Sequence, residues 1–393
     1  MILTLNSGSS SVKFSLFQFS GASSDTALCL ARGQIEGLGA EPSFEVRVGQ
    51  GERNHLPVPS ATPGKATHND AIAAILTWLG SAFTGQTVHA VGHRVVHGGT
   101  GFEAPVVIND GILTQLEQLV ALAPLHQPHN LAGIRAAQAA FKQVPQIACF
   151  DTAFHRCQPF VSQTFALPHH YFDEGVRRYG FHGLSYEFIT AQLRQTDPAL
   201  ASGRVVVAHL GNGASMAAVH NGKSVASTMG FTALDGLPMG TRSGQIDPGV
   251  LLYLMDAKGM SATQIGHLLY KQSGLLGMSG LSQDMRTLEA SQDPKAQAAI
   301  DYFCHRISRE TAALAAAMGG IDALVFTGGI GEHSSKVRAQ VCASLTWMGI
   351  ELDPDRNAQH CGNISSDASC IQVRVMQTDE EQMIAKHCHE LIG

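Results

Sequence analysis

The sequence predicts an α/β protein built from two copies of one design. Residues 205–207 are three valines that predict a buried strand, and the turn 211–213 after them contains two glycines. The N-terminus repeats this order, with an apolar strand at 2–5, a small polar turn at 6–10 and a returning strand at 12–17. Two copies, about half a chain apart, predict an internal duplication with a nucleotide between the halves.

A third glycine turn has the same setting. Residues 323–326 predict a strand, 327–331 the turn, and 334–347 a helix. A helix that begins after a glycine turn offers unpaired backbone amides to an anion. The strand at 216–219 is expected to turn back in a hairpin at Asn221 and Gly222.

The rest of the chain alternates between helices and strands, as expected for mixed sheets with helices on their faces. The predicted strands lie at 37–51, 88–96, 146–150 and 371–375. The predicted helices lie at 110–123, 130–141, 185–193, 249–256, 261–270, 295–318 and 380–391. One more helix is expected to begin after Asn69 as its N-cap. Residues 231–248 are rich in glycine and proline, and a loop this long within a compact domain is usually functional.

The composition is that of a globular protein with small-molecule partners. The 393 residues suit two domains, and 44% are hydrophobic while 15% are charged. The net charge of −6 comes without a run of like charges, so neither nucleic acid nor an anionic membrane is an expected partner. The N-terminus does not resemble a signal peptide, and no apolar run reaches transmembrane length, so we expect a cytoplasmic protein with reduced cysteines.

Several polar residues stand beside the predicted turns. The turn from Asn6 to Lys13 offers an amide, hydroxyls and an ammonium, which suit a polyphosphate and its metal, although alone it could be a serine-rich hairpin. Arg94 and Arg242 stand between glycines and could bind a carboxylate or phosphoryl group, or form surface ion pairs. Asp151 follows a buried strand as a candidate catalytic carboxylate, or as an ordinary turn residue.

Histidines beside turns are candidates for stabilising a transferring phosphoryl group. They are His126, His182 and His209. His93 and His97 have the spacing of zinc ligands on a helix, but the valines between them predict a strand, so a zinc site is not expected.

Eight motifs in order along the whole chain resemble those of the acetokinase family, which includes acetate, propionate and butyrate kinases. The motifs are NSGSSSVKF at 6–14, GHRVVHGG at 92–99, APLH at 123–126, FDTAFH at 150–155, RRYGFHG at 177–183, HLGNGAS at 209–215, MGTRSG at 239–244 and GGIGE at 328–332. The resemblance implies a duplicated actin-like ATPase (ribonuclease H-like) fold with the active site in the cleft between two domains, and a homodimer. The N-terminal domain would span 1–150 and be joined by the C-terminal helix 381–393; the domain 151–380 would bind the nucleotide and dimerise.

The reaction that the resemblance implies is reversible transfer of the γ-phosphoryl group of ATP to acetate, and to propionate. The products would be an acyl phosphate, such as acetyl phosphate on the way to acetyl-CoA, and ADP. Magnesium, or manganese in its place, would bridge the phosphates. The implied partners are these small molecules, ATP and a second copy of the chain.

The resemblance also assigns roles to residues of this chain. The metal positions are Asn6 and Glu380. The nucleotide-contacting positions are Lys13, His209, Leu210, Gly211, Asn212, Gly213, Asp284, Met285, Arg286, Gly329, Ile330, Gly331, Glu332 and His333. Arg94 and Arg242 would flank the carboxylate and γ-phosphoryl group, and His182 would stabilise the transition state. A carboxylate substrate is already ionised at neutral pH, because carboxyl pKa values lie near ~4, so Asp151 is expected to orient Arg94 or the metal shell.

The expected acyl pocket consists of Val96, Leu125, His126, Phe181 and Ala233. Ala233 stands where acetate kinases typically carry proline, and the smaller side chain is expected to leave room for another methylene. Other departures from the family pattern are Gln127, Leu184, Tyr186, Gln245 and His333.

Two other functions fit the sequence less well. A sugar or polyol kinase of the same fold would need a base to deprotonate a hydroxyl and polar residues to bind it, whereas the expected pocket is apolar with an arginine at its end. A nucleotide-gated switch or chaperone would need a peptide-binding extension, for which the sequence shows no candidate.

Overall fold

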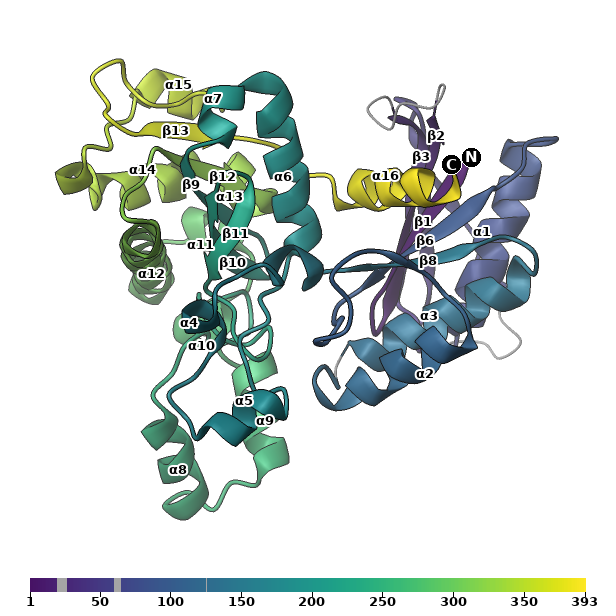
Figure 1. Ribbon diagram of the computed structural model, residues 1–393, viewed down its shortest axis with the longest axis horizontal. Coiled ribbons are helices and arrows are strands. Elements are labelled where there is room, and N and C mark those ends of the chain that lie inside the picture. Colours follow the sequence, from purple (N-terminus) through teal and green to yellow (C-terminus); the bar gives the residue numbers. More distant parts are fainter. Residues whose placement is uncertain (20–26, 60–64, 125) are drawn as a thin grey trace. The chain divides into compact units, whose positions relative to one another are not determined.

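The computed structural model describes residues 1–19, 27–59, 65–124 and 126–393. These residues form two compact units (Figure 1). Unit 1 contains Met1–Phe154 and Asp379–Gly393, and unit 2 contains His155–Thr378.

Unit 1 is built on a mixed sheet in the order β5-β4-β3-β2-β1-β6-β8-β7. Its strands are β1 (Ile2–Ser7), β2 (Ser11–Phe19), β3 (Ala27–Glu36), β4 (Ser43–Val48), β5 (Arg53–Leu56), β6 (Ala90–Val95), β7 (Val106–Val107) and β8 (Gln146–Phe150). The strands β1 to β5 are antiparallel neighbours, whereas β6 runs parallel to both β1 and β8.

Unit 2 repeats the central part of this sheet. Its order is β11-β10-β9-β12-β13, with β9 (Arg204–Leu210), β10 (Ala214–His220), β11 (Lys223–Ser227), β12 (Ala323–Thr327) and β13 (Gln372–Val375). As in the series β3-β2-β1-β6-β8, the first three strands form antiparallel pairs and the last two join in parallel. The repeated order and directions confirm the duplication predicted from the two turns.

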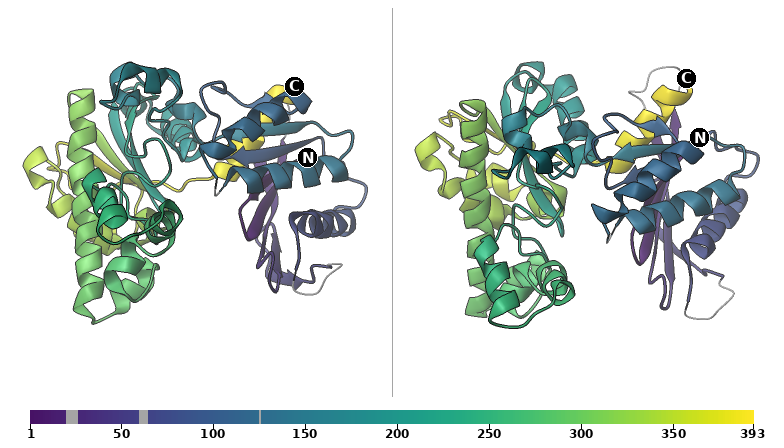
Figure 2. Two further views of the ribbon diagram at one scale, coloured as in Figure 1. Left: turned by 90° about the horizontal axis from the view of Figure 1, so that it is seen from below. Right: turned by 60° about the horizontal axis from the view of Figure 1, so that its bottom comes forward.

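Helices cover both faces of the unit 1 sheet. They are α1 (His68–Ala82), α2 (Asp110–Gln118), α3 (Gln127–Ala140) and α16 (Glu380–Ile392), with 3-10 turns at Leu119–Ala121 and Ala153–His155. Val91 packs into the core that α1 and α3 share, whereas the adjacent Gly92 faces Ile384 of α16. Because successive residues of a strand point to opposite faces, α16 covers the face opposite to α1 and α3 (Figure 2).

In unit 2 the long helix α12 (Pro294–Met318) packs against β9, β10 and β11. The other helices are α4 (Phe160–Gln163), α5 (His169–Asp173), α6 (Gly183–Thr196), α7 (Pro198–Ala201), α8 (Pro248–Asp256), α9 (Ala262–Lys271), α10 (Gly274–Ser279), α11 (Met285–Ala290), α13 (Gly328–His333), α14 (Ser335–Ala343) and α15 (Pro354–Ala358), with a 3-10 turn at Thr346–Met348. No helix in the described part of the chain is both long and apolar enough to span a membrane.

The structure corrects the predicted start of the first helix. The N-cap is Thr67, not Asn69. The Thr67 hydroxyl accepts the backbone N–H of Asp70, and the Asp70 carboxylate accepts the Thr67 N–H in return. This reciprocal pair of hydrogen bonds satisfies two backbone N–H groups at the start of the helix, which an Asn69 side chain alone could not do.

Other element predictions were partly wrong. The glycine turn predicted at 327–331 is mostly the helix α13, which directly follows β12, and the helix predicted to reach 347 ends at Ala343. The strand predicted at 37–51 is limited to β4, while the long strand β3 was not predicted. The hairpin at Asn221 and Gly222 is confirmed, with φ of 50° and 69°, as a type I′ turn requires.

Candidate active site

The strands β6 and β8 bring two predicted site residues together in unit 1. Arg94 lies near the C-terminal end of β6, and Asp151 directly follows β8. Because these strands are parallel, their carboxyl ends share one edge of the sheet. Arg94 Nε lies 3.0 Å from Asp151 Oδ1 and Nη2 lies 2.6 Å from Oδ2, so the guanidinium binds the carboxylate through two parallel hydrogen bonds.

Asn6 and Glu380, the two residues that the resemblance assigns to the metal, both lie beside Arg94. Glu380, the first residue of α16, has Oε2 3.5 Å from Arg94 Nε, and Asn6 of β1 has Oδ1 3.5 Å from Arg94 Nη1. Burial opposes the charge of Arg94, but the carboxylates of Asp151 and Glu380 overcome this effect and raise its pKa above the usual value. The guanidinium therefore stays charged.

These oxygen atoms fit a hard divalent cation. Asn6, Asp151 and Glu380 offer an amide oxygen and carboxylate oxygens at the same arginine, and magnesium in phosphate-binding sites uses few protein oxygens together with water and phosphates. No group of three or more His, Cys, Asp or Glu side chains among the described residues could hold a metal on its own. The donor set therefore suits a metal that arrives with a phosphate ligand.

The backbone around this edge is held by a buried amide. Asn130 of α3 accepts the N–H of Val96 at 3.0 Å and donates to the carbonyl of Ser7 at 2.8 Å. Gln127, which departs from the family pattern, is fully buried and donates to the carbonyls of His97 and Leu116. Asn130 thus joins the end of β1 to the segment after β6, and Gln127 joins that segment to α2.

In unit 2 the predicted histidine His182 belongs to a chain of hydroxyl groups. Its Nδ1 lies 2.8 Å from Ser215 Oγ, which in turn lies 2.5 Å from the hydroxyl of Tyr186. His182 precedes α6 with φ of 57°, a left-handed conformation that is costly for a residue other than glycine. If Tyr186 donates to Ser215 and Ser215 to Nδ1, then His182 carries its proton on Nε2.

The glycine loop after β9 lies against His182 and Arg242. A Cβ added to Gly213 would lie 3.2 Å from Arg242 Nη2 and 3.3 Å from His182 Nε2, so a side chain there would crowd both groups. Arg242 is held from its other side, because its Nη1 donates to the carbonyl of Ala233 at 2.7 Å. The structure thus places three predicted residues, His182, Arg242 and Ala233, in one cluster of unit 2.

His209 extends this cluster toward α13. Its ring stacks on the ring of His182, with centroids 4.4 Å apart, and its Nδ1 lies 2.8 Å from Ser185 Oγ. Ser185 also bonds to Thr378. The Glu332 carboxylate accepts the N–H of Gly328 at 2.9 Å, so this predicted nucleotide residue is bound to the start of its own helix.

Most of the other predicted nucleotide residues line one cavity of about 420 Å³ within unit 2. Its lining consists of Gly211, Asn212, Gln283, Asp284, Met285, Arg286, Glu289, Gly329, Ile330, His333 and Ser334. Three of these, Gln283, Glu289 and Ser334, were not predicted. Asp284 and Arg286 are paired with each other at 3.0 and 2.6 Å, and hydrogen bonds from Arg286 lower the pKa of Asp284.

The predicted acyl pocket is distributed over both units. Val96 and His126 belong to unit 1, Phe181 and Ala233 to unit 2, and Leu125 lies outside the described residues. Val96 and Phe181 are buried, and His126 precedes the first turn of α3. Lys13 of β2 lines a pocket on the sheet of unit 1.

Three departures from the family pattern have clear contacts. Tyr186 supplies the last hydroxyl of the His182 chain, and Leu184 is buried at the start of α6. The Gln245 side-chain oxygen accepts hydrogen bonds from Arg306 at 2.9 Å and from Arg309 at 3.1 Å. An uncharged amide therefore stands beside two arginines, one of which, Arg306, is buried.

A buried histidine predicts how stability depends on pH. Burial lowers the pKa of His155 to about 4, although its Nε2 lies 3.0 Å from the carbonyl of Phe181. The unfolded chain takes up this proton near pH ~6.5, so the free energy of unfolding should fall as the pH drops from 6.5 to 4, by roughly 3 kcal/mol for this residue. Urea titrations of the wild type and His155→Gln between pH 4.5 and 7 test this, and an equal pH slope for both would contradict it.

The comparison with protein families covers almost the whole chain. A model described as "Acetokinase family" matches residues 1–386. An acetate kinase of Methylocella silvestris is 53% identical over 394 residues, which cover 100% of this chain and 98% of the relative. An acetate kinase of Rhodopseudomonas palustris is 50% identical over 395 residues, with the same coverage.

Solved structures agree with the sequence relatives. A propionate kinase from Francisella tularensis has a TM-score of 0.91 at 37% identity, with 99% of each chain covered. An acetate kinase from Porphyromonas gingivalis has a TM-score of 0.89 at 38% identity, with 100% of this chain and 99% of that chain covered. These similarities confirm the duplicated actin-like fold predicted from the motifs. The chain therefore belongs to the acetokinase family, a family of kinases that use ATP to phosphorylate a carboxyl group.

Proposed function

We propose that this chain catalyses the reversible, magnesium-dependent transfer of the γ-phosphoryl group of ATP to acetate, and also to propionate. The observation that carries this proposal is the geometry of Arg94. Its guanidinium is oriented by two hydrogen bonds to Asp151, and about a fifth of its side chain remains exposed. A fixed and charged guanidinium at the edge of the sheet suits an anionic acceptor.

The transfer needs positioning and charge neutralisation more than proton transfer. Carboxylate substrates are ionised at neutral pH, so no general base is required, and Asp151 acts by holding the plane of the Arg94 guanidinium. Arg94 and Arg242 neutralise the carboxylate and the transferring phosphoryl group. His182, with its proton on Nε2, donates a hydrogen bond as charge develops on the phosphoryl oxygens.

Asn6 and Glu380 would hold the divalent cation, which we infer to be Mg²⁺ and replaceable by Mn²⁺. When bound, it would neutralise negative charge on the phosphate oxygens. The adenine end of ATP occupies the cavity lined by Gly211, Met285 and Ile330 in unit 2, and the amides at the start of α13 lie beside it. Homodimer formation through unit 2, and a cytoplasmic location, stay predictions from the sequence.

The direct test is formation of acyl hydroxamate with ATP, Mg²⁺ and hydroxylamine, which traps an acyl phosphate as it forms. Acetate and propionate are expected to give product, and glycerol is expected to give none. Release of ADP with glycerol but not with either acid would support the sugar kinase alternative and contradict the proposal.

Ala233 is the position where we expect the acyl chain length to be set. Ala233→Pro should lower kcat/KM for propionate relative to acetate by about tenfold, because one methylene contributes ~1–3 kcal/mol to discrimination. The Arg242 contact survives the change, since Arg242 binds the carbonyl of residue 233. An unchanged ratio of kcat/KM for the two acids would show that another residue limits the pocket.

A further inference from the structure

Three arginines stand directly opposite one another on the sheet of unit 1. Arg32 of β3 pairs with Arg47 of β4, and Arg47 pairs with Arg53 of β5. Like charges at directly opposed positions of antiparallel strands destabilise the sheet. The arrangement therefore costs stability unless an anion compensates it.

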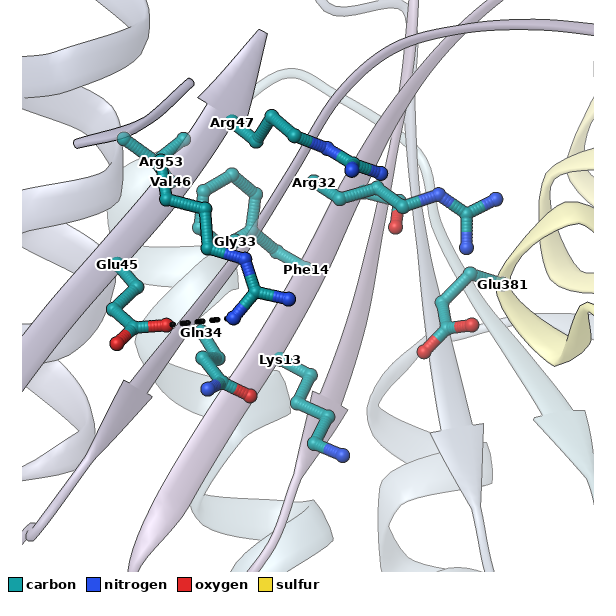
Figure 3. Close-up of a pocket in the computed structure, with 11 residues that line it drawn as sticks. Lys13, Phe14, Arg32, Gly33, Gln34, Glu45, Val46, Arg47, Arg53 and Glu381 are labelled. Atoms are coloured by element: carbon teal, nitrogen blue, oxygen red, sulfur yellow. Dashed lines mark ion pairs between the residues drawn. The ribbon is translucent and has the colours of Figure 1, made fainter. Parts of the chain in front are cut away.

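The three arginines belong to a polar face of the sheet. Lys13 of β2 pairs with Gln34, and Gln34 pairs with Glu45, which adds a second polar row beside the arginines. The residues that alternate with them, such as Phe14 and Val46, point to the opposite face and pack in the core. Figure 3 shows the Lys13 ammonium and the three guanidinium groups around one pocket, with Glu381 of α16 at its side.

The charge of this pocket is compensated only in part. Four cationic and two carboxyl side chains line its volume of about 230 Å³. Arg32 has a carboxylate partner, Asp379, and Arg53 lies 3.6 Å from Glu45. In the described part of the chain no carboxylate is paired with Arg47 or Lys13.

We propose that the basic face formed by Arg32, Arg47 and Arg53 is a binding site for a compact anion that carries two linked phosphoryl groups. A guanidinium binds a phosphoryl group through two hydrogen bonds, and neighbouring strands lie only about 4.8 Å apart. Two linked phosphoryl groups can therefore meet arginines of two adjacent strands. The pocket on the sheet of unit 1 and the nucleotide cavity of unit 2 are lined by different residues.

The test measures binding of inorganic diphosphate by calorimetry, in a chelator and without nucleotide. Arg47→Gln is expected to weaken binding about tenfold or more, since it removes charge-assisted hydrogen bonds. The matched control is Arg135→Gln, which removes an exposed arginine of α3 from the same unit and should leave the affinity unchanged. Arg53→Gln is a second variant of the basic face, for use if Arg47→Gln does not fold.

A second measurement, the unfolding temperature, distinguishes specific binding of diphosphate at this face from general screening of charge by salt. Without diphosphate, Arg47→Gln should unfold at a higher temperature than the wild type, because the repulsion between the arginines is relieved. With diphosphate, the wild type should gain more in unfolding temperature than Arg47→Gln. UDP replaces diphosphate in a parallel series, to distinguish free diphosphate from the tail of a nucleotide as the natural source.

Equal diphosphate affinity in the wild type and Arg47→Gln would overturn the proposal. So would an equal rise in unfolding temperature with sodium chloride at the same ionic strength. Hydroxamate formation without diphosphate should be unchanged in Arg47→Gln, because Arg47 has no role in the proposed transfer. If the protein did not phosphorylate acetate or propionate, the diphosphate-binding result would still stand. The two proposals can therefore be refuted independently.

Discussion

Replacing Arg94 by alanine is expected to lower kcat for hydroxamate formation by about 10² to 10³, and to destabilise unit 1. The catalytic loss follows because alanine removes the guanidinium that Asp151 and Glu380 hold charged. The stability loss follows because Asp151, only 1% exposed, is left as a buried carboxylate without its arginine. Breaking such a pair by removing one partner costs roughly 3–5 kcal/mol.

A double variant separates the two effects of this change. In Arg94→Ala/Asp151→Asn the buried charge is removed together with its partner, so urea titration should show most of the stability restored, while kcat stays low. Recovery of activity in the double variant would show that Arg94 acts on stability alone.

The sequence was sufficient to predict the parts of the site that depend on strand order. Arg94 lies near the end of one strand and Asp151 directly follows another, and parallel strands bring their carboxyl ends to one edge. The cavity lined by Gly211 and Gly329 follows from the same rule in unit 2, because β9 and β12 are parallel neighbours. Local patterns and the duplicated topology thus account for the main features of the site.

Contacts between distant side chains could not be predicted in this way. The chain from Tyr186 through Ser215 to His182 depends on how α6 packs near β10, and the left-handed φ of His182 has no local signal. The opposed arginines were also missed. Their pairing depends on the register of β3, β4 and β5, and β3 itself was not recognised.

Arg338 is the clearest example of a residue whose contacts could not be predicted, because nothing in its local sequence indicates its role. It is fully buried, and its guanidinium donates to the carbonyls of Gly331 and Glu332 at 2.8 and 2.9 Å. It also donates to Asn357 Oδ1 and to the Asn357 carbonyl, each at 2.8 Å, and contacts His360 Nδ1 at 3.0 Å. Burial lowers the pKa of Arg338, and its hydrogen bonds join α13 to α15.

Arg338→Met is therefore expected to lower the free energy of unfolding by at least about 3 kcal/mol, since several buried acceptors lose their donor at ~1–3 kcal/mol each. It should also raise KM for ATP about tenfold with little change in kcat, because α13 carries Gly329, Ile330 and His333 of the nucleotide cavity. Arg338→Lys keeps the charge and some donors, and should recover part of both losses. Lys223→Met, at an exposed position of β11, is the control for removing a cation from unit 2. A stability loss with unchanged KM for ATP would mean that Arg338 holds the fold together without positioning α13 for the nucleotide.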